Sequence, residues 1–140
     1  MALQTKIKPM RKEDVSEVVK GWNENFVFDR VGEEKFEDTI FNDLNYEPNS
    51  TLVAIDEEKI TGFASCAARE GILGKDGVGT EEEKDIGYIK GMFYQDADTG
   101  QALLEKIEEY MLSKGKKGIR VADYHGVNFF PGIDLRFCQP

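Results

Sequence analysis

The sequence predicts a single α/β domain, and three observations lead to that prediction. The expected elements follow one another as strand, two helices, three strands, helix and strand. The long helix expected over 99–114 has one apolar face, and the strand before it, 88–94, is rich in aromatic and β-branched residues. The chain of 140 residues is long enough for one domain with a core and too short for two.

The first part of the chain predicts a short strand over 7–10 and two amphipathic helices. Asp14 and Glu17 have the spacing of a capping box, which predicts the start of the first helix. A second helix is expected over 33–44, with acidic residues in its first turn. We expect the apolar positions of both helices to pack in the core; they are Val15, Val18, Val19, Trp22, Phe26, Phe36, Ile40 and Leu44.

The middle of the chain predicts a hairpin followed by a loop. Strands over 51–56 and 59–69 are joined by a polar turn at 56–59. Gly62, inside the second strand, predicts a bulge or a close backbone approach. The stretch 70–85 is rich in glycine and acidic residues and is expected to be a loop. Lys75 in this loop is not followed by Ser or Thr, nor by a helix, which argues against a Walker-type phosphate loop.

A strand, a loop at 95–100 and the long helix come next, and this junction is the candidate functional site. The N–H groups at a helix N-terminus carry partial positive charge and suit a phosphate. A Lys- and Gly-rich stretch at 113–118 ends the helix, and a further strand is expected over 118–124. The helix buries the residues Leu103, Leu104, Ile107, Tyr110 and Met111.

Composition excludes some functions. The net charge of −9 argues against a nucleic-acid or anionic-membrane surface, because such partners require a basic face. No apolar run is long enough to span a bilayer and no leader opens the chain, so a cytoplasmic location is expected. Cys66 and Cys138 have no metal or redox spacing, and Cys66 is expected in the core.

The segment Gln95-x-x-Asp98-x-Gly100-x-x-Leu103-Leu104 resembles the pyrophosphate loop of the GNAT acetyltransferases. That loop is written Q/R-x-x-G-x-G/A and is usually followed by paired aliphatic residues. Here Asp98 replaces the first glycine, and Met-Phe-Tyr at 92–94 stands where the family has hydrophobic-x-Pro. The element order is that of the family's first five strands and three helices, and 128–134 resembles a segment after the fifth strand in some members, including tandem ones.

The resemblance implies a GNAT-like mixed, mostly antiparallel sheet whose C-terminal helix and last two strands are missing from 1–140. It also implies an acetyl-CoA-dependent N-acetyltransferase that transfers the acetyl group directly to a small-molecule or peptide amine. One wall of the acceptor site would be formed by the region of Phe26, Phe28 and Phe41, for which core packing is the alternative. The implied cofactor-binding residues are Met92, Phe93, Tyr94, Gln95, Asp98, Thr99, Gly100, Gln101 and Ala102.

Asp98 leads to an alternative. It stands at the expected N-cap of the long helix, with Gln101 as its capping-box partner. A carboxylate at position 98 would occupy the amides that would otherwise bind a pyrophosphate. Its negative charge would also repel the pyrophosphate, and Asp96 adds further negative charge. The alternative is a non-catalytic GNAT-like domain that serves as an interaction or oligomerisation module. The segment Asp96-x-Asp98-x-Gly100 begins like an EF-hand calcium loop, but the later ligands of such a loop are missing. No metal site is therefore predicted.

Three residues are candidates for proton transfer. Tyr124 and His125 follow the last expected strand, and Glu70 ends the third strand. The pKa of an ordinary histidine suits proton transfer near neutral pH. A surface position for His125 and a loop position for Glu70 are the plainer alternatives. Because an open strand edge at Val121 is a liability, a homodimer formed by strand exchange is an additional expectation.

Overall fold

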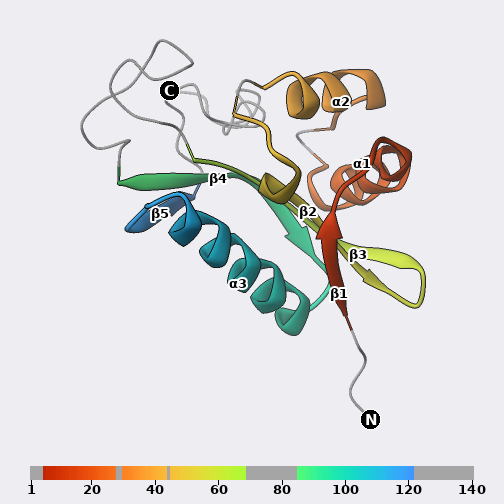
Figure 1. Ribbon diagram of the computed structural model, residues 1–140. Coiled ribbons are helices and arrows are strands. Elements are labelled where there is room, and N and C mark those ends of the chain that lie inside the picture. The colour runs from red at the N-terminus through yellow and green to blue at the C-terminus, as the bar shows by residue number, and fades with distance from the viewer. Residues whose placement is uncertain (1–4, 28–29, 44, 69–84, 122–140) are drawn as a thin grey trace, which may run out of the picture.

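The computed structural model describes residues 5–27, 30–43, 45–68 and 85–121 of the chain (Figure 1). The strands in that part are β1 (Lys6–Pro9), β2 (Thr51–Asp56), β3 (Lys59–Ala67), β4 (Ile86–Tyr94) and β5 (Gly118–Val121). The helices are α1 (Val15–Asn25), α2 (Glu33–Phe41) and α3 (Ala97–Ser113), with two short 3-10 turns, η1 (Lys12–Asp14) and η2 (Pro48–Ser50). The predicted order of elements and the fold class are confirmed for these residues.

Several predictions fall on residues outside the described ranges. The fold beyond Val121, which includes the expected end of the last strand and the segment 128–134, is among them. So are nearly all of the predicted loop at 70–85 and the residues Phe28, Leu44, Glu70, Lys75, Tyr124, His125 and Cys138.

The sheet is antiparallel from β1 to β4 and parallel between β4 and β5. The strands lie in chain order, so each of the first four pairs with its neighbour in sequence. The connection from β4 to β5 runs through α3, because parallel neighbours require a crossover. The described residues of β5 pair with the first four residues of β4, from Ile86 to Ile89.

Helices cover both faces of the sheet, with α1 and α2 on one face and α3 on the other (Figure 1). The α1/α2 side is aromatic: the ring centroids of Phe63 and Phe93 lie 5.8 Å apart, and those of Phe36 and Phe63 lie 5.4 Å apart. The α3 side is mainly aliphatic, and Leu103 and Ile107 are fully buried there. The apolar helix positions predicted as core are buried or half-buried wherever the structure describes them.

The hairpin between β2 and β3 forms as predicted. Glu57 and Glu58 have φ of 50° and 67°, and a two-residue turn with positive φ at both positions matches the twist of paired strands. The register then shifts between Ala54 and Ile55, which is the bulge predicted near Gly62. A Cβ on Gly62 would lie 3.0 Å from side-chain carbons of Leu103 and Thr99, so α3 packs directly against the backbone here.

The predicted capping box at the first helix is wrong. Asp14 is the N-cap residue of α1, but its side chain does not cap the helix. Its Oδ2 accepts the Arg11 N–H at 2.9 Å and Lys8 Nζ at 3.1 Å instead. Glu17 Oε2 accepts the Ile60 N–H at 2.8 Å, so it ties α1 to β3. Asp14 thus bonds to residues that precede it in the chain, and Glu17 bonds to a residue far along the chain, so neither carboxylate closes the predicted box.

Candidate functional site

Within the described residues, the second half of β4 has a strand partner on its β3 side alone. Ile89 pairs with Val121, and no further β4 residue pairs with a strand on this side in the described part of the chain (Figure 1). The change coincides with a bulge, because Gly91 pairs with Ser65 and Ile89 pairs with Cys66, which leaves Lys90 as the extra residue. In the part of the chain that the structure describes, β4 therefore presents a backbone edge from its bulge to its end at Tyr94.

The register shows which backbone groups face this edge. The Gln95 N–H donates to the Thr61 carbonyl at 3.0 Å, on the β3 side. Residues in an antiparallel ladder alternate between pointing at the partner and pointing away from it. The N–H and C=O groups of Met92 and Tyr94 therefore point toward the open edge, and those of Phe93 point toward β3. The phenyl ring of Phe93 is buried beside Gly21, on the α1/α2 face.

The loop after β4 is much shorter than predicted. β4 ends at Tyr94 and α3 begins at Ala97, so Gln95 and Asp96 alone form the connection. Asp96 is the N-cap of α3, and its Oδ1 accepts the Thr99 N–H at 2.8 Å. The Asp96 carbonyl accepts the Gly100 N–H at 3.1 Å. The predicted N-cap at Asp98 is therefore wrong.

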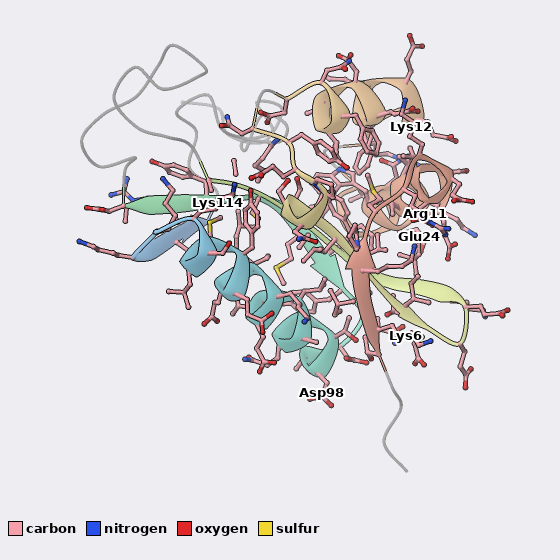
Figure 2. All side chains as sticks on the ribbon, in the orientation of Figure 1. Lys6, Arg11, Lys12, Glu24, Asp98 and Lys114 are labelled. Atoms are coloured by element: carbon pink, nitrogen blue, oxygen red, sulfur yellow. The ribbon has the colours of Figure 1, made fainter. Side chains whose placement is uncertain are left out.

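Asp98 lies in the first turn of α3, and Figure 2 shows its side chain directed away from the sheet. The capping box predicted with Gln101 is also absent, since the Gln101 side chain donates to Glu105 at 3.4 Å. Hydrogen bonds from Thr99 hold the pKa of the Asp96 carboxyl below its ordinary value. An exposed carboxylate, that of Asp96, therefore bonds to the helix N-terminus.

Gly100 packs against an aromatic ring. A Cβ at this position would lie 2.9 Å from the ring of Tyr94, which is itself 48 % exposed. Thr99 and Gly100 are buried, whereas the residues from Tyr94 to Asp98 are exposed. The glycine matched to the end of the pyrophosphate motif therefore has a packing role in this chain. The sequence did not indicate this role, because strand and helix had to meet before the ring could reach Gly100.

A second polar group lies on the α1/α2 side of the bulge. Lys90 Nζ donates to Asp43 Oδ2, and the Lys90 side chain is only 5 % exposed. Burial works to raise the pKa of the Asp43 carboxyl, but Lys90 and the Asn45 N–H outweigh it and the pKa lies below its ordinary value. This group was not predicted. A lysine inside the apolar strand at 88–94 was the signal that could have indicated it.

A third group joins the C-terminal end of α3 to the segment before β2. Glu47 Oε1 accepts the Tyr110 hydroxyl, and Lys114 Nζ lies 2.6 Å from the same oxygen. Burial and this hydrogen bond raise the pKa of the Tyr110 hydroxyl. Nearby, Cys66 is buried as predicted; burial raises the pKa of its thiol to about 12, so the thiol stays protonated.

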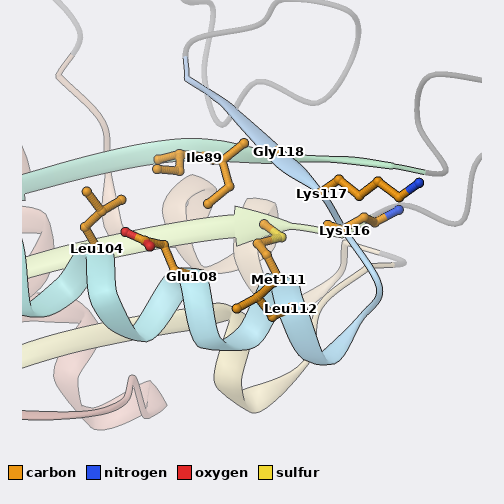
Figure 3. Close-up of a pocket in the computed structure, with 9 residues that line it drawn as sticks. Ile89, Leu104, Glu108, Met111, Leu112, Lys116, Lys117 and Gly118 are labelled. Atoms are coloured by element: carbon orange, nitrogen blue, oxygen red, sulfur yellow. The ribbon is translucent and has the colours of Figure 1, made fainter.

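A cavity of about 400 Å³ lies between the C-terminal half of α3 and the start of β5 (Figure 3). Its walls are mostly apolar and include Ile89, Leu104 and Ile119, with Glu108 and Lys117 also lining it. Leu112, 72 % exposed, lies at the same place. The cavity does not include the first turn of α3, so it is separate from the helix N-terminus.

The candidate acid–base residues Tyr124, His125 and Glu70 lie outside the described ranges, and their roles stay predictions. Among the residues that the structure describes, no cluster of three or more His, Cys, Asp or Glu side chains could hold a metal ion. None of the described helices is both long and apolar enough to cross a membrane.

Comparisons with known proteins identify the fold. No protein-family model matches the sequence, and no curated protein matches it significantly. Solved structures do match. Aminoglycoside N-acetyltransferase AAC(6')-Iy, in complex with CoA, has a TM-score of 0.64 at 11% identity, over 90% of this chain and 81% of that chain.

Two further structures are similar to the same extent. A GNAT family acetyltransferase from Brucella melitensis, in complex with acetyl-CoA, has a TM-score of 0.61 at 15% identity, over 89% of this chain and 79% of that chain. A transcriptional regulator from Bacillus halodurans C-125 has a TM-score of 0.64 at 16% identity, over 88% and 84%. At such identities the likeness shows the fold alone.

Proposed function

We propose that this chain, which has the fold of the GNAT acetyltransferases, is an N-acetyltransferase that uses acetyl-CoA and an amine acceptor. The observation that carries the proposal is the placement of two features side by side. The open backbone edge of β4 ends at Tyr94, and α3 begins after only two intervening residues. An extended chain with amide groups and an anionic end fits that combination.

Different residues of the site would contact different parts of the CoA molecule. The N–H and C=O groups of Met92 and Tyr94 would pair with the pantetheine amides, as an added strand does. The amides of the first turn of α3, up to Ala102, would face the pyrophosphate. Asp96 now bonds to the Thr99 N–H, so its carboxylate must rotate away before an anion takes that place.

The reaction itself places few demands on side chains. The unprotonated acceptor amine attacks the thioester carbonyl carbon, the C–S bond breaks, and the CoA thiolate leaves and takes up a proton. An N–H of the open β4 edge near the bulge would hydrogen-bond the developing oxyanion. The proton released by the amine would pass to Tyr124, His125 or Glu70, which remain the candidate groups for that step.

A second candidate function follows from the charge at the helix N-terminus. Asp96 and Asp98 are both exposed there, and each repels a pyrophosphate. If Asp96 stays bonded to the first turn, the domain keeps the fold without CoA and acts as an interaction or oligomerisation module. The cytoplasmic location and the homodimer by strand exchange stay predictions under either function.

Isothermal titration with acetyl-CoA separates the two functions. Asp96→Asn removes the charge and keeps an N-cap oxygen, because asparagine caps helices as well as aspartate does. We expect the wild type to bind and Asp96→Asn to bind about tenfold more tightly. Glu24→Gln on α1 makes the same change in net charge away from the site, and it should leave the affinity unchanged (Figure 2). No heat for any variant at millimolar acetyl-CoA would exclude the transferase.

A further inference from the structure

We propose that Asn45 and Asp43, in the segment between α2 and β2, bind a protonated amino group of the acceptor. The acceptor would then carry at least two amino groups, one that is acetylated at the β4 edge and one that is held by this segment. The inference rests on the proposed function, since it names the substrate class of the same site. The occupant expected is a diamine, a polyamine or an amino sugar.

The first evidence is an oxygen without a hydrogen-bond donor. Asn45 is only 8 % exposed, and its Oδ1 has no hydrogen-bond partner. No other buried side-chain nitrogen or oxygen of the described residues is left in this state. Buried carbonyl oxygens are rarely left without a donor, because the loss of hydration is not compensated. The site around Asn45 is therefore complementary to an N–H or O–H donor.

The second evidence is the carboxylate next to it. The Asn45 N–H donates to Asp43 Oδ1 at 2.7 Å. An unpaired oxygen beside a carboxylate favours a cationic donor and disfavours an anionic one.

The ion pair of Asp43 keeps the carboxylate charged while the site is empty. Lys90 Nζ donates to Asp43 Oδ2, yet the Asp43 side chain is still 24 % exposed, so it can be reached from solvent. An ammonium group has three N–H donors, which is enough for Asn45 Oδ1 and an Asp43 oxygen together. The net charge of −9 also attracts a polycation to the molecule.

The third evidence is position. Lys90 is the extra residue of the β4 bulge, and it directly follows Ile89, the last β4 residue that pairs with the described residues of β5. The Asp43–Lys90 pair therefore fixes the segment with Asn45 beside the β4 bulge. A second amino group bound there would lie near the place at which the proposed acetyl transfer occurs.

The test compares amines by isothermal titration without CoA. The probes are putrescine, cadaverine and spermidine, with butylamine as the monoamine and butanediol as the uncharged analogue. We expect at least one probe with two or more amino groups to bind the wild type about tenfold more tightly than butylamine. If all of these amines bind no better than butylamine, or none binds at millimolar concentration, the inference is wrong.

Two variants and a matched control assign the binding to Asn45. Asn45→Leu removes the oxygen, and we expect a loss of about tenfold in polyamine affinity with an unchanged or higher melting temperature. Asn45→Asp keeps an acceptor oxygen and should keep the binding. Asn49→Leu makes the same replacement at an exposed position of the same segment and should change nothing. A lower melting temperature with unchanged affinity in Asn45→Leu would show that Asn45 is purely structural.

A parallel titration with acetyl-CoA distinguishes failure of this inference from failure of the proposed function. Asn45 is not one of the residues proposed to contact CoA, so Asn45→Leu should bind acetyl-CoA as the wild type does. If the wild type did not bind acetyl-CoA, the transferase proposal would be contradicted. Polyamine binding that depends on Asn45 would still support the amine site in that case.

Discussion

The two ends of α3 are held in different ways. At the C-terminal end, Tyr110 and Lys114 both bind Glu47, and Met111 packs so tightly against Gly87 that a Cβ there would lie 2.1 Å from its sulfur. At the N-terminal end, the side-chain bond that caps the helix comes from Asp96, an exposed residue that is adjacent in sequence.

We infer from this difference that the C-terminal end of α3 contributes mainly to stability and that its N-terminal end serves the proposed binding. Long-range contacts fix the C-terminal end, so the direction of α3 does not depend on its first turn. At the N-terminal end, the Thr99 amide bonds to one exposed carboxylate, which the pyrophosphate of the proposed function would replace. The following changes test the comparison, from the largest expected effect to the smallest.

Ile107→Ala should have the largest effect on stability. Ile107 is fully buried between α3 and the sheet, and the truncation leaves a cavity in the α3 side of the core. We expect the free energy of unfolding to fall by about 2–5 kcal/mol, measured by urea denaturation. Leu112→Ala, at a position 72 % exposed, is the control and should change it little. Equal losses in the two variants would mean that α3 is not packed as described.

Tyr110→Phe should have an intermediate effect. The change leaves the ring in place and removes the hydroxyl that donates to Glu47, so we expect a loss of about 1.5–3 kcal/mol. CoA affinity should not change, because the change lies at the far end of the helix. A clear loss of CoA affinity would show that the two ends are coupled and would contradict the comparison.

Tyr110 should also set the alkaline limit of stability. The pKa of Tyr110 is raised in the folded protein. Its contribution to the free energy of unfolding is therefore complete below the ordinary tyrosine pKa of about 10, and it declines as the pH rises above that value. Thermal melts between neutral and strongly alkaline pH should therefore show a decline that is weaker in Tyr110→Phe. If both proteins decline in parallel, other groups control that limit.

Asp96→Ala should destabilise the protein less than Tyr110→Phe does. The lost bond is exposed and supports only the first turn of α3. We expect the Thr99 amide to exchange with solvent hydrogen faster, while amides near Ile107 keep their protection, as hydrogen exchange can measure. Faster exchange along the entire helix would mean that the N-terminal cap carries more of the stability than we infer.

Asp98→Ala should have the smallest effect. Its side chain is exposed in the first turn, so the free energy of unfolding should change by less than about 0.5 kcal/mol in the same urea titration. If Asp98→Ala were more destabilising than Asp96→Ala, the cap would be Asp98, as the sequence motif suggested.

The order of strands and helices could be predicted because local patterns control it. The spacing of apolar residues in α1 and α3, and the polar turn before Lys59, depend on neighbours within a few residues. The same holds for the end of α3, where Gly115 has a φ of +77° and the Lys116 N–H bonds to the Met111 carbonyl. These elements formed close to where the pattern placed them.

The details of the candidate site depended on contacts between distant residues. Asp96 rather than Asp98 caps α3 because α3 already begins at Ala97, directly after the bond from the Gln95 N–H to the Thr61 carbonyl. The Asp43–Lys90 pair joins positions 47 residues apart in sequence. Periodicity and motif spacing are local, so they determined which residues face the core. Strand register and helix placement are set by the whole sheet, so the tertiary structure alone decided which backbone groups and charges meet at the site.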